Sequence, residues 1–190
     1  MVCAQEALVQ LELDRVVFMP VGVAPHREIE LDPGAEARLE MAELAVASDE
    51  RFEVSRMEVE KESPAYTSET LAALREETPE DELFLILGGD QAAALGSWHE
   101  PERVLELATV VVFDRASWGR NAIGIKIGRL AGARSVRYLD MPLIQVSSSA
   151  IRRRVREGRP IRYLVPDSVA DYISSNDLYG AGRAEEALTS

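Results

Sequence analysis

The 190-residue sequence has one cysteine, Cys3, so it can form neither an internal disulfide nor a cysteine metal cluster. Its two histidines, His26 and His99, are far apart, and no His/Asp/Glu spacing indicates a metal site. No apolar run approaches the roughly 20 residues that span a bilayer. The start of the chain lacks basic residues and carries Glu6 and Glu12, unlike a secretory signal peptide. These absences favour a cytoplasmic protein without a resident metal and without a membrane partner.

The charge of the chain is strongly one-sided, with a formal net charge of −12 at pH 7. This argues against general binding to nucleic acid or to an anionic membrane surface. Six arginines between Arg152 and Arg162 form a local exception, which is either a solvated face or part of a site. The length fits one domain, which we place at residues 1–180, followed by a flexible tail at 181–190.

Short apolar runs alternate with segments of helical periodicity along the chain. The expected strands are 16–19, 83–87, 109–114 and 136–139, with 52–58 a weaker candidate. The expected helices are 2–13, 34–47, one that residues 66–71 open and that runs to about 77 (capped by Thr67 or Ser68), one after 90, 101–107, 123–133, one after the serines at 147–149, and 166–176, with a loop at 116–122. This alternation predicts an α/β fold with a doubly wound parallel sheet. Ligands of such sheets bind beyond the carboxyl ends of the strands, where the sequence places His26, Asp90, Arg115 and the segment 147–152.

The segment 145–156 reads as a strand end, three serines and a basic helix. Serine is a preferred N-cap, and the free N–H groups of a helix N-terminus can bind phosphate. Arg152 falls in or just after the first turn, where its planar guanidinium suits phosphate oxygens. The local chemistry is that of an anion site, although a capped surface helix with solvated arginines explains the same residues.

Other candidates also have two readings each. Gly88, Gly89 and Asp90 follow the clearest strand, where they could approach a nucleotide and bind its sugar hydroxyls, or form a tight turn in which Asp90 caps the next helix. Trp98 could stack on a heterocycle or be part of the core. His26 could contact a phosphate or be a solvated loop residue. The three serines lack the G-x-S-x-G pattern of a nucleophile elbow.

In order and spacing, these motifs resemble those of the bacterial nicotinate-nucleotide adenylyltransferases, of the nucleotidyltransferase superfamily. The resemblance runs from about Ala4 to Tyr179. It rests on the loop 20–27 ending Ala-Pro-His-Arg, Arg38 with Met41, Tyr-Thr-Ser-Glu-Thr-Leu at 66–71, Gly-Gly-Asp at 88–90 followed by Trp98, the run 110–115, Ser-Ser-Ser-Ala-Ile-Arg at 147–152, Val-Ala-Asp-Tyr-Ile at 169–173, and Leu-Tyr at 178–179.

The resemblance implies a Rossmann-like nucleotidyltransferase fold and adenylyl transfer from ATP to nicotinate mononucleotide, with Mg²⁺. The products are deamido-NAD and pyrophosphate, and the protein supplies no covalent nucleophile. It also implies residue roles. Arg152 would be catalytic, and the ATP-binding residues would be Gly88, Asp90, Ser148, Ser149, Ile151 and Arg152. Those that bind the mononucleotide would be His26, Thr67, Trp98 and Arg115. Whether the protein forms a homo-oligomer stays open.

One departure concerns the start of the chain. The family begins with a strand and a G-x-F-x-P-x-H-x-G-H segment whose histidines meet the ATP phosphates, and neither is found here. Residues 1–4 look like the helix that follows that segment. We therefore expect the first strand to be missing and the activity of this chain to be weak or absent, because of either a misplaced start codon or genuine shortening. A helix without a start signal favours the former.

Two alternatives to this activity stay open. One is a sibling adenylyltransferase that acts on another phosphate, such as pantetheine phosphate. The other is a nucleotide-binding remnant without catalysis, and a scaffold without any ligand is a more distant third.

Overall fold

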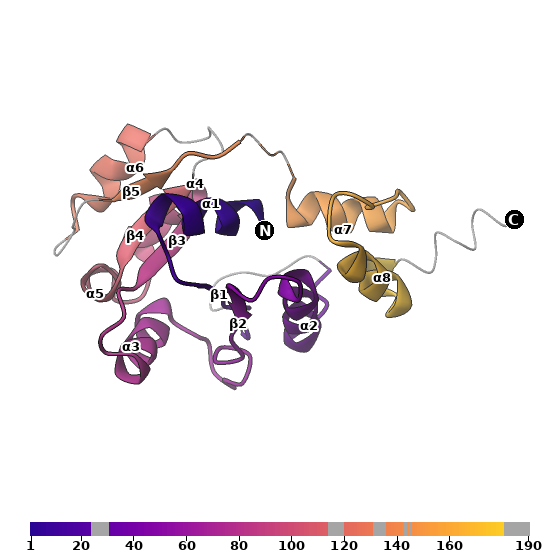
Figure 1. Cartoon of the computed structure of the whole chain (residues 1–190), viewed down its shortest axis with the longest axis horizontal. Coiled ribbons are helices and arrows are strands. Elements are labelled where there is room, and N and C mark those ends of the chain that lie inside the picture. Colours follow the sequence, from indigo (N-terminus) through magenta and orange to yellow (C-terminus); the bar gives the residue numbers. More distant parts are fainter. Residues whose placement is uncertain (24–30, 114–119, 131–135, 143, 145, 181–190) are drawn as a thin grey trace, which may run out of the picture. The chain divides into compact units, whose positions relative to one another are not determined.

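The computed structural model describes residues 1–23, 31–113, 120–130, 136–142, 144 and 146–180 (Figure 1). The chain divides into two compact units. Unit 1 comprises Met1, Arg15–Pro64 and Gln145–Ser190, and unit 2 comprises Val2–Asp14 and Ala65–Ile144. Each unit has its own parallel sheet and its own apolar core. None of the helices in the described ranges is long and apolar enough to cross a membrane.

Unit 1 is built on a pair of short parallel strands. Strand β1 (Val16–Phe18) pairs with β2 (Phe52–Val54), with Val16 opposite Phe52 and Phe18 opposite Val54. The other elements of the unit are α2 (Ala35–Val46), α7 (Ser148–Arg156), α8 (Asp167–Ser175) and the 3-10 turn η2 (Leu178–Gly180). The core joins helices from both ends of the sequence, because Ile151, Val155 and Ile173 are buried together and Met41 of α2 packs against them.

Unit 2 contains three parallel strands in the order β3–β4–β5. These are β3 (Phe84–Gly88), β4 (Thr109–Phe113) and β5 (Arg137–Leu139). The helical elements of the unit are α1 (Val2–Leu11), α3 (Thr67–Glu77), α4 (Gly89–Ala94), η1 (Leu95–Ser97), α5 (Pro101–Leu107) and α6 (Arg120–Ile127).

The central strand β4 is buried on both faces. Val111 packs with Ala7 and Leu11 of α1 on one face, whereas Val112 belongs to the opposite cluster, which includes Leu95 and residues of α3 to α6. Alternate residues of a strand point to opposite faces, so an unbroken valine run can fill two apolar layers.

The prediction of an α/β fold with parallel strands is confirmed by both sheets. That residues 1–180 act as one domain stays a prediction.

Two expected boundaries are wrong. The expected loop 116–122 includes residues of α6, which begins at Arg120, because Ile123 and Ile127 lie four residues apart and are buried on the same helix face. The expected strand 52–58 ends at Val54. There the Ser55 hydroxyl accepts a hydrogen bond from the N–H of Met57 at 3.2 Å, which favours a turn over further strand pairing.

The cap of α3 also differs from expectation. Tyr66 is the N-cap residue, and its carbonyl oxygen accepts hydrogen bonds from the N–H groups of Glu69 and Thr70 at 3.0 and 3.1 Å. Thr67 is therefore already the first helical residue, and no side chain caps this helix. When Thr and Ser stand side by side before a helical pattern, either of them can be the cap or the first helical residue. Uncertainty of one or two residues is usual at helix ends.

Candidate functional site

The serine-arginine segment folds as predicted into a capped basic helix. Ser147 has extended backbone angles, and its Oγ accepts a hydrogen bond from the N–H of Ala150 at 3.2 Å. In the next turns Ile151 and Val155 are buried, which anchors one face of α7 to the core. Arg152 donates from Nη2 to Ser149 Oγ at 3.2 Å. The cap thus fixes the start of a helix that displays its first N–H groups, a serine hydroxyl and a guanidinium together.

A cavity of about 480 Å³ lies beside this helix, entirely within unit 1. Ser148, Ile151 and Arg152 of α7 form one wall. The other walls come from the carboxyl end of β1 and from α2, α8 and η2, and they are largely apolar. The volume is in the range typical of small-molecule sites. Ser148, Ile151 and Arg152 are thus brought together on one cavity at the end of a parallel strand.

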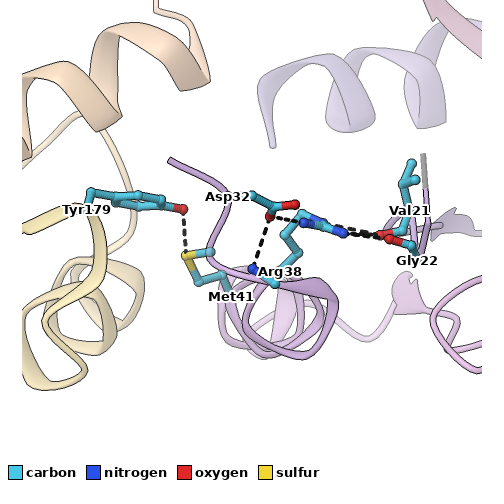
Figure 2. A network of polar contacts seen from close by, with 7 residues as sticks. Val21, Gly22, Asp32, Arg38, Met41 and Tyr179 are labelled. Carbon is cyan, nitrogen blue, oxygen red and sulfur yellow. Dashed lines mark hydrogen bonds and ion pairs between the residues drawn. The ribbon is translucent and has the colours of Figure 1, made fainter. Parts of the chain in front are cut away.

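Arg38 is a second guanidinium on the cavity wall, and its donors are already occupied (Figure 2). It donates to the carbonyl oxygen of Val21 from Nε at 3.2 Å and from Nη2 at 2.7 Å, and to that of Gly22 at 2.8 Å. It also pairs with Asp32, whose Oδ1 accepts the N–H of Gly34 at 3.0 Å. Arg38 therefore fixes the chain that leaves β1, and Arg152 is the more available cation for a ligand.

The phenol of Tyr179 is the polar tip of another wall residue. Its hydroxyl donates to Met41 Sδ at 4.0 Å. Burial raises the pKa of Tyr179 above its usual value, while the charges of Arg152 and Arg38 lower it and that of Asp32 raises it. The phenol is consequently neutral at physiological pH and can donate a hydrogen bond.

Four other predicted residues belong to unit 2. Gly88 ends β3 and is the N-cap residue of α4, so the alternative in which Asp90 caps that helix is wrong. Asp90 instead occupies the first turn of α4, because the backbone already turns into the helix at Gly89. Trp98 is half-buried and packs against the core cluster of unit 2. Thr67 is the first residue of α3.

The predicted residues His26 and Arg115 lie outside the described residues. The other histidine, His99, lies against Tyr66 with ring centroids 4.3 Å apart. On the cavity wall the structure adds Arg38 and Tyr179, which carried the family resemblance without an individual role. Arg38 could have been noticed as the single basic residue of an otherwise acidic helix.

Among the described residues, no group of three or more His, Cys, Asp or Glu side chains could hold a metal ion. Mg²⁺ in phosphoryl-transfer sites typically keeps several waters and binds through substrate phosphates plus one or two carboxylates.

Comparison with known proteins gives first the family to which the chain belongs and then the group within it. The model of the cytidylyltransferase-like family matches residues 1–154. A relative from Rubrobacter xylanophilus, named a probable nicotinate-nucleotide adenylyltransferase, is 37% identical over 182 residues, covering 95% of this chain and 85% of the relative. One from Tropheryma whipplei strain Twist, with the same name, is 38% identical over 179 residues, covering 94% and 91%. The chain therefore belongs to the cytidylyltransferase-like family, and within it to the nicotinate-nucleotide adenylyltransferases, as the sequence motifs predicted.

Solved structures support the fold. The Plasmodium falciparum nicotinic acid mononucleotide adenylyltransferase complexed with NaAD matches with a TM-score of 0.71 at 16% identity, over 93% of this chain and 90% of that chain. The same protein complexed with APC also matches with a TM-score of 0.71. At this level of identity the likeness confirms the predicted Rossmann-like nucleotidyltransferase fold.

Proposed function

We propose that this protein transfers the adenylyl group of ATP to nicotinate mononucleotide, giving deamido-NAD and pyrophosphate. The observation that carries the proposal is the start of α7, a serine-capped basic helix of the kind that binds phosphate groups. It is supported by the 37% identity of this chain, over 95% of its length, to the probable nicotinate-nucleotide adenylyltransferase of Rubrobacter. The capped helix start, Ser148 and Arg152 offer hydrogen bonds and positive charge on one cavity wall. Polyphosphate oxygens are the ligands that this chemistry binds best.

The reaction requires no nucleophile from the protein. An oxygen of the 5′-phosphate of the mononucleotide attacks the α-phosphorus of ATP. A new P–O bond forms, the bond from the α-phosphorus to the bridging oxygen breaks, and pyrophosphate leaves with the electron pair. Negative charge therefore builds on the departing phosphates. Arg152 would stabilise that charge, and Ser148 and Ser149 would orient the same oxygens, so that catalysis consists of positioning and charge stabilisation.

The remaining predicted residues take binding roles in this proposal. Ile151, which is buried and lines the cavity, supports the turn that contacts ATP. Gly88 and Asp90 bind the ribose region, for which the carboxylate accepts hydroxyl hydrogen bonds. Thr67, Trp98, His26 and Arg115 bind the nicotinate nucleotide, with Trp98 stacking on the ring. Mg²⁺ bound to the ATP phosphates would offset part of their charge beside Arg152.

The experiment is pyrophosphate release from ATP, Mg²⁺ and nicotinate mononucleotide by the purified chain. Parallel reactions contain nicotinamide mononucleotide or pantetheine phosphate, and calorimetry measures the binding of ATP and of the mononucleotide. Because weak activity is expected of this chain, release is compared between substrates, and release with nicotinate mononucleotide is expected to be well above that with the other two. Release with pantetheine phosphate alone would overturn the substrate assignment. Binding of both nucleotides without release would overturn the catalytic assignment, and the absence of both binding and release would overturn the proposal as a whole.

A further inference from the structure

Tyr179 has a left-handed backbone, with φ 61° and ψ 14°, in the turn η2. A bulky residue seldom adopts this conformation, because its Cβ crowds the neighbouring backbone. Such a conformation is concentrated at functional sites. Tyr163 has a similar φ of 66° but is 87% exposed, so the backbone angle by itself marks no site. Tyr179 differs because its side chain is half-buried and packs on neighbouring helices.

The ring of Tyr179 links three helices of unit 1. The turn η2 packs against α7 and α8. Tyr179 and its neighbour Leu178 both pack on the buried cluster that contains Ile151 and Ile173. At its far end the phenol reaches Met41 of α2, as Figure 2 shows. A thioether sulfur is a weak acceptor, so packing of the ring accounts for this link better than the hydrogen bond does.

The same ring shares a cavity wall with Arg152. Both residues line the cavity, together with Ser148, whereas Leu178 does not. Within the described part of the chain, Arg152 makes no ion pair, and its guanidinium is bonded to Ser149 Oγ alone. A long side chain with so few contacts loses much rotamer freedom when it binds a ligand. A rigid neighbour that restricts it beforehand reduces this loss.

We propose that Tyr179 is a positioning residue for Arg152. Its ring forms the wall that keeps the Arg152 guanidinium directed at the ATP phosphates. This role rests on the proposed function, and it assigns a part in ATP binding to the turn that follows the last long helix. The ring carries the effect, and the hydroxyl does not.

Calorimetric titration with ATP and Mg²⁺ tests the role in the full chain. Tyr179→Phe keeps the ring and is expected to bind ATP within about two-fold of wild type, whereas Tyr179→Leu raises the Kd about five-fold. Tyr179→Met, which retains apolar volume without a rigid ring, replaces the leucine variant if that chain does not fold. Leu178→Ala is the matched control, because it loosens the same cluster and lowers the melting temperature, yet leaves the Kd for ATP unchanged.

A double-mutant cycle separates positioning from general loosening. In an Arg152→Ala background, Tyr179→Leu is expected to add no further loss of ATP affinity, because the group that it positions is gone. An equal loss in both backgrounds, or a loss in Tyr179→Phe as large as in Tyr179→Leu, would overturn the role. If wild type binds ATP and Tyr179→Leu binds it equally well, only this role fails. If wild type does not bind ATP, the proposed function fails and the role with it.

Discussion

The carbonyl oxygen of Glu58 occupies the position at which a side chain on Gly22 would begin. A Cβ placed on Gly22 would lie 2.0 Å from this oxygen, 2.9 Å from its carbon and 3.2 Å from the Cα of Val59. The carbonyl oxygen of Gly22 also accepts a hydrogen bond from Arg38 Nη2, at 2.8 Å. The chain leaving β1 is therefore fixed by a guanidinium and by a backbone segment, and that chain contributes Pro20 to the cavity.

We expect Gly22→Ala to lower the free energy of unfolding by about 1–3 kcal/mol or more, since neither backbone segment can yield as a flexible side chain would. Urea denaturation measures the change. Gly96→Ala is the control, because its added Cβ would lie at an ordinary 3.5 Å from Leu130. That variant should be neutral or more stable by a few tenths of a kcal/mol, through lower entropy of the unfolded chain. Equal stability of Gly22→Ala and wild type would contradict the packing described here.

The sequence alone predicted the features that depend on local patterns. The apolar run 109–114 indicated a strand, and the serines before Ile151 indicated a capped helix. The cavity could not be predicted in this way, because Arg38 and Tyr179 come from opposite ends of the chain and meet only through packing. The cap of α3 and the start of α6 were misplaced, because the N-cap residue of α3 is Tyr66, which has no capping side chain, and because the buried Ile123 and Ile127 lie on one face of α6.

Two adjacent arginines should differ sharply in their effect on ATP binding. Arg152 lines the cavity, whereas Arg153 is exposed and is not among the cavity residues. Loss of a charge-assisted hydrogen bond costs about 1.5–3 kcal/mol, so Arg152→Ala should raise the Kd for ATP roughly 10- to 150-fold. Arg153→Ala removes the same charge one residue away and should change the Kd less than about two-fold at 0.15 M salt. Similar losses in both variants would indicate a diffuse effect of the basic patch rather than a contact.

Asp49 and Arg51, between α2 and β2, provide a test of the local electrostatics. Asp49 accepts hydrogen bonds from Arg51 Nε at 2.9 Å and from the backbone N–H of Arg51 at 3.1 Å. The Arg51 side chain, followed by its backbone N–H, lowers the pKa of Asp49 from 3.8 to about 2. Because the pKa is lower in the folded state, the stability from this pair is present above about pH 4. It is lost as the pH falls from there toward 2.

NMR titration of the Asp49 carboxyl carbon checks this directly. In Arg51→Ala the pKa of Asp49 should rise toward 3.8 without reaching it, because the backbone donor at residue 51 remains. Arg15→Ala is the matched control, since Arg15 pairs with Glu53 on the neighbouring strand and not with Asp49. A pKa of Asp49 that is unchanged by Arg51→Ala would show that the side-chain hydrogen bonds are absent in solution.

Ser147→Ala should remove the cap of α7 without removing any group that lines the cavity. Loss of an N-cap serine lowers stability by about 1 kcal/mol, with a range of about 0.5–2. Ser174→Ala, an exposed serine in the last turn of α8, loses no cap and should leave the free energy of unfolding within about 0.5 kcal/mol of wild type. Because fraying at the start of α7 also disorders the N–H groups near Ser148, ATP affinity should fall a few-fold in Ser147→Ala alone. Destabilisation by Ser147→Ala with unchanged ATP affinity would show that ATP does not depend on the start of this helix.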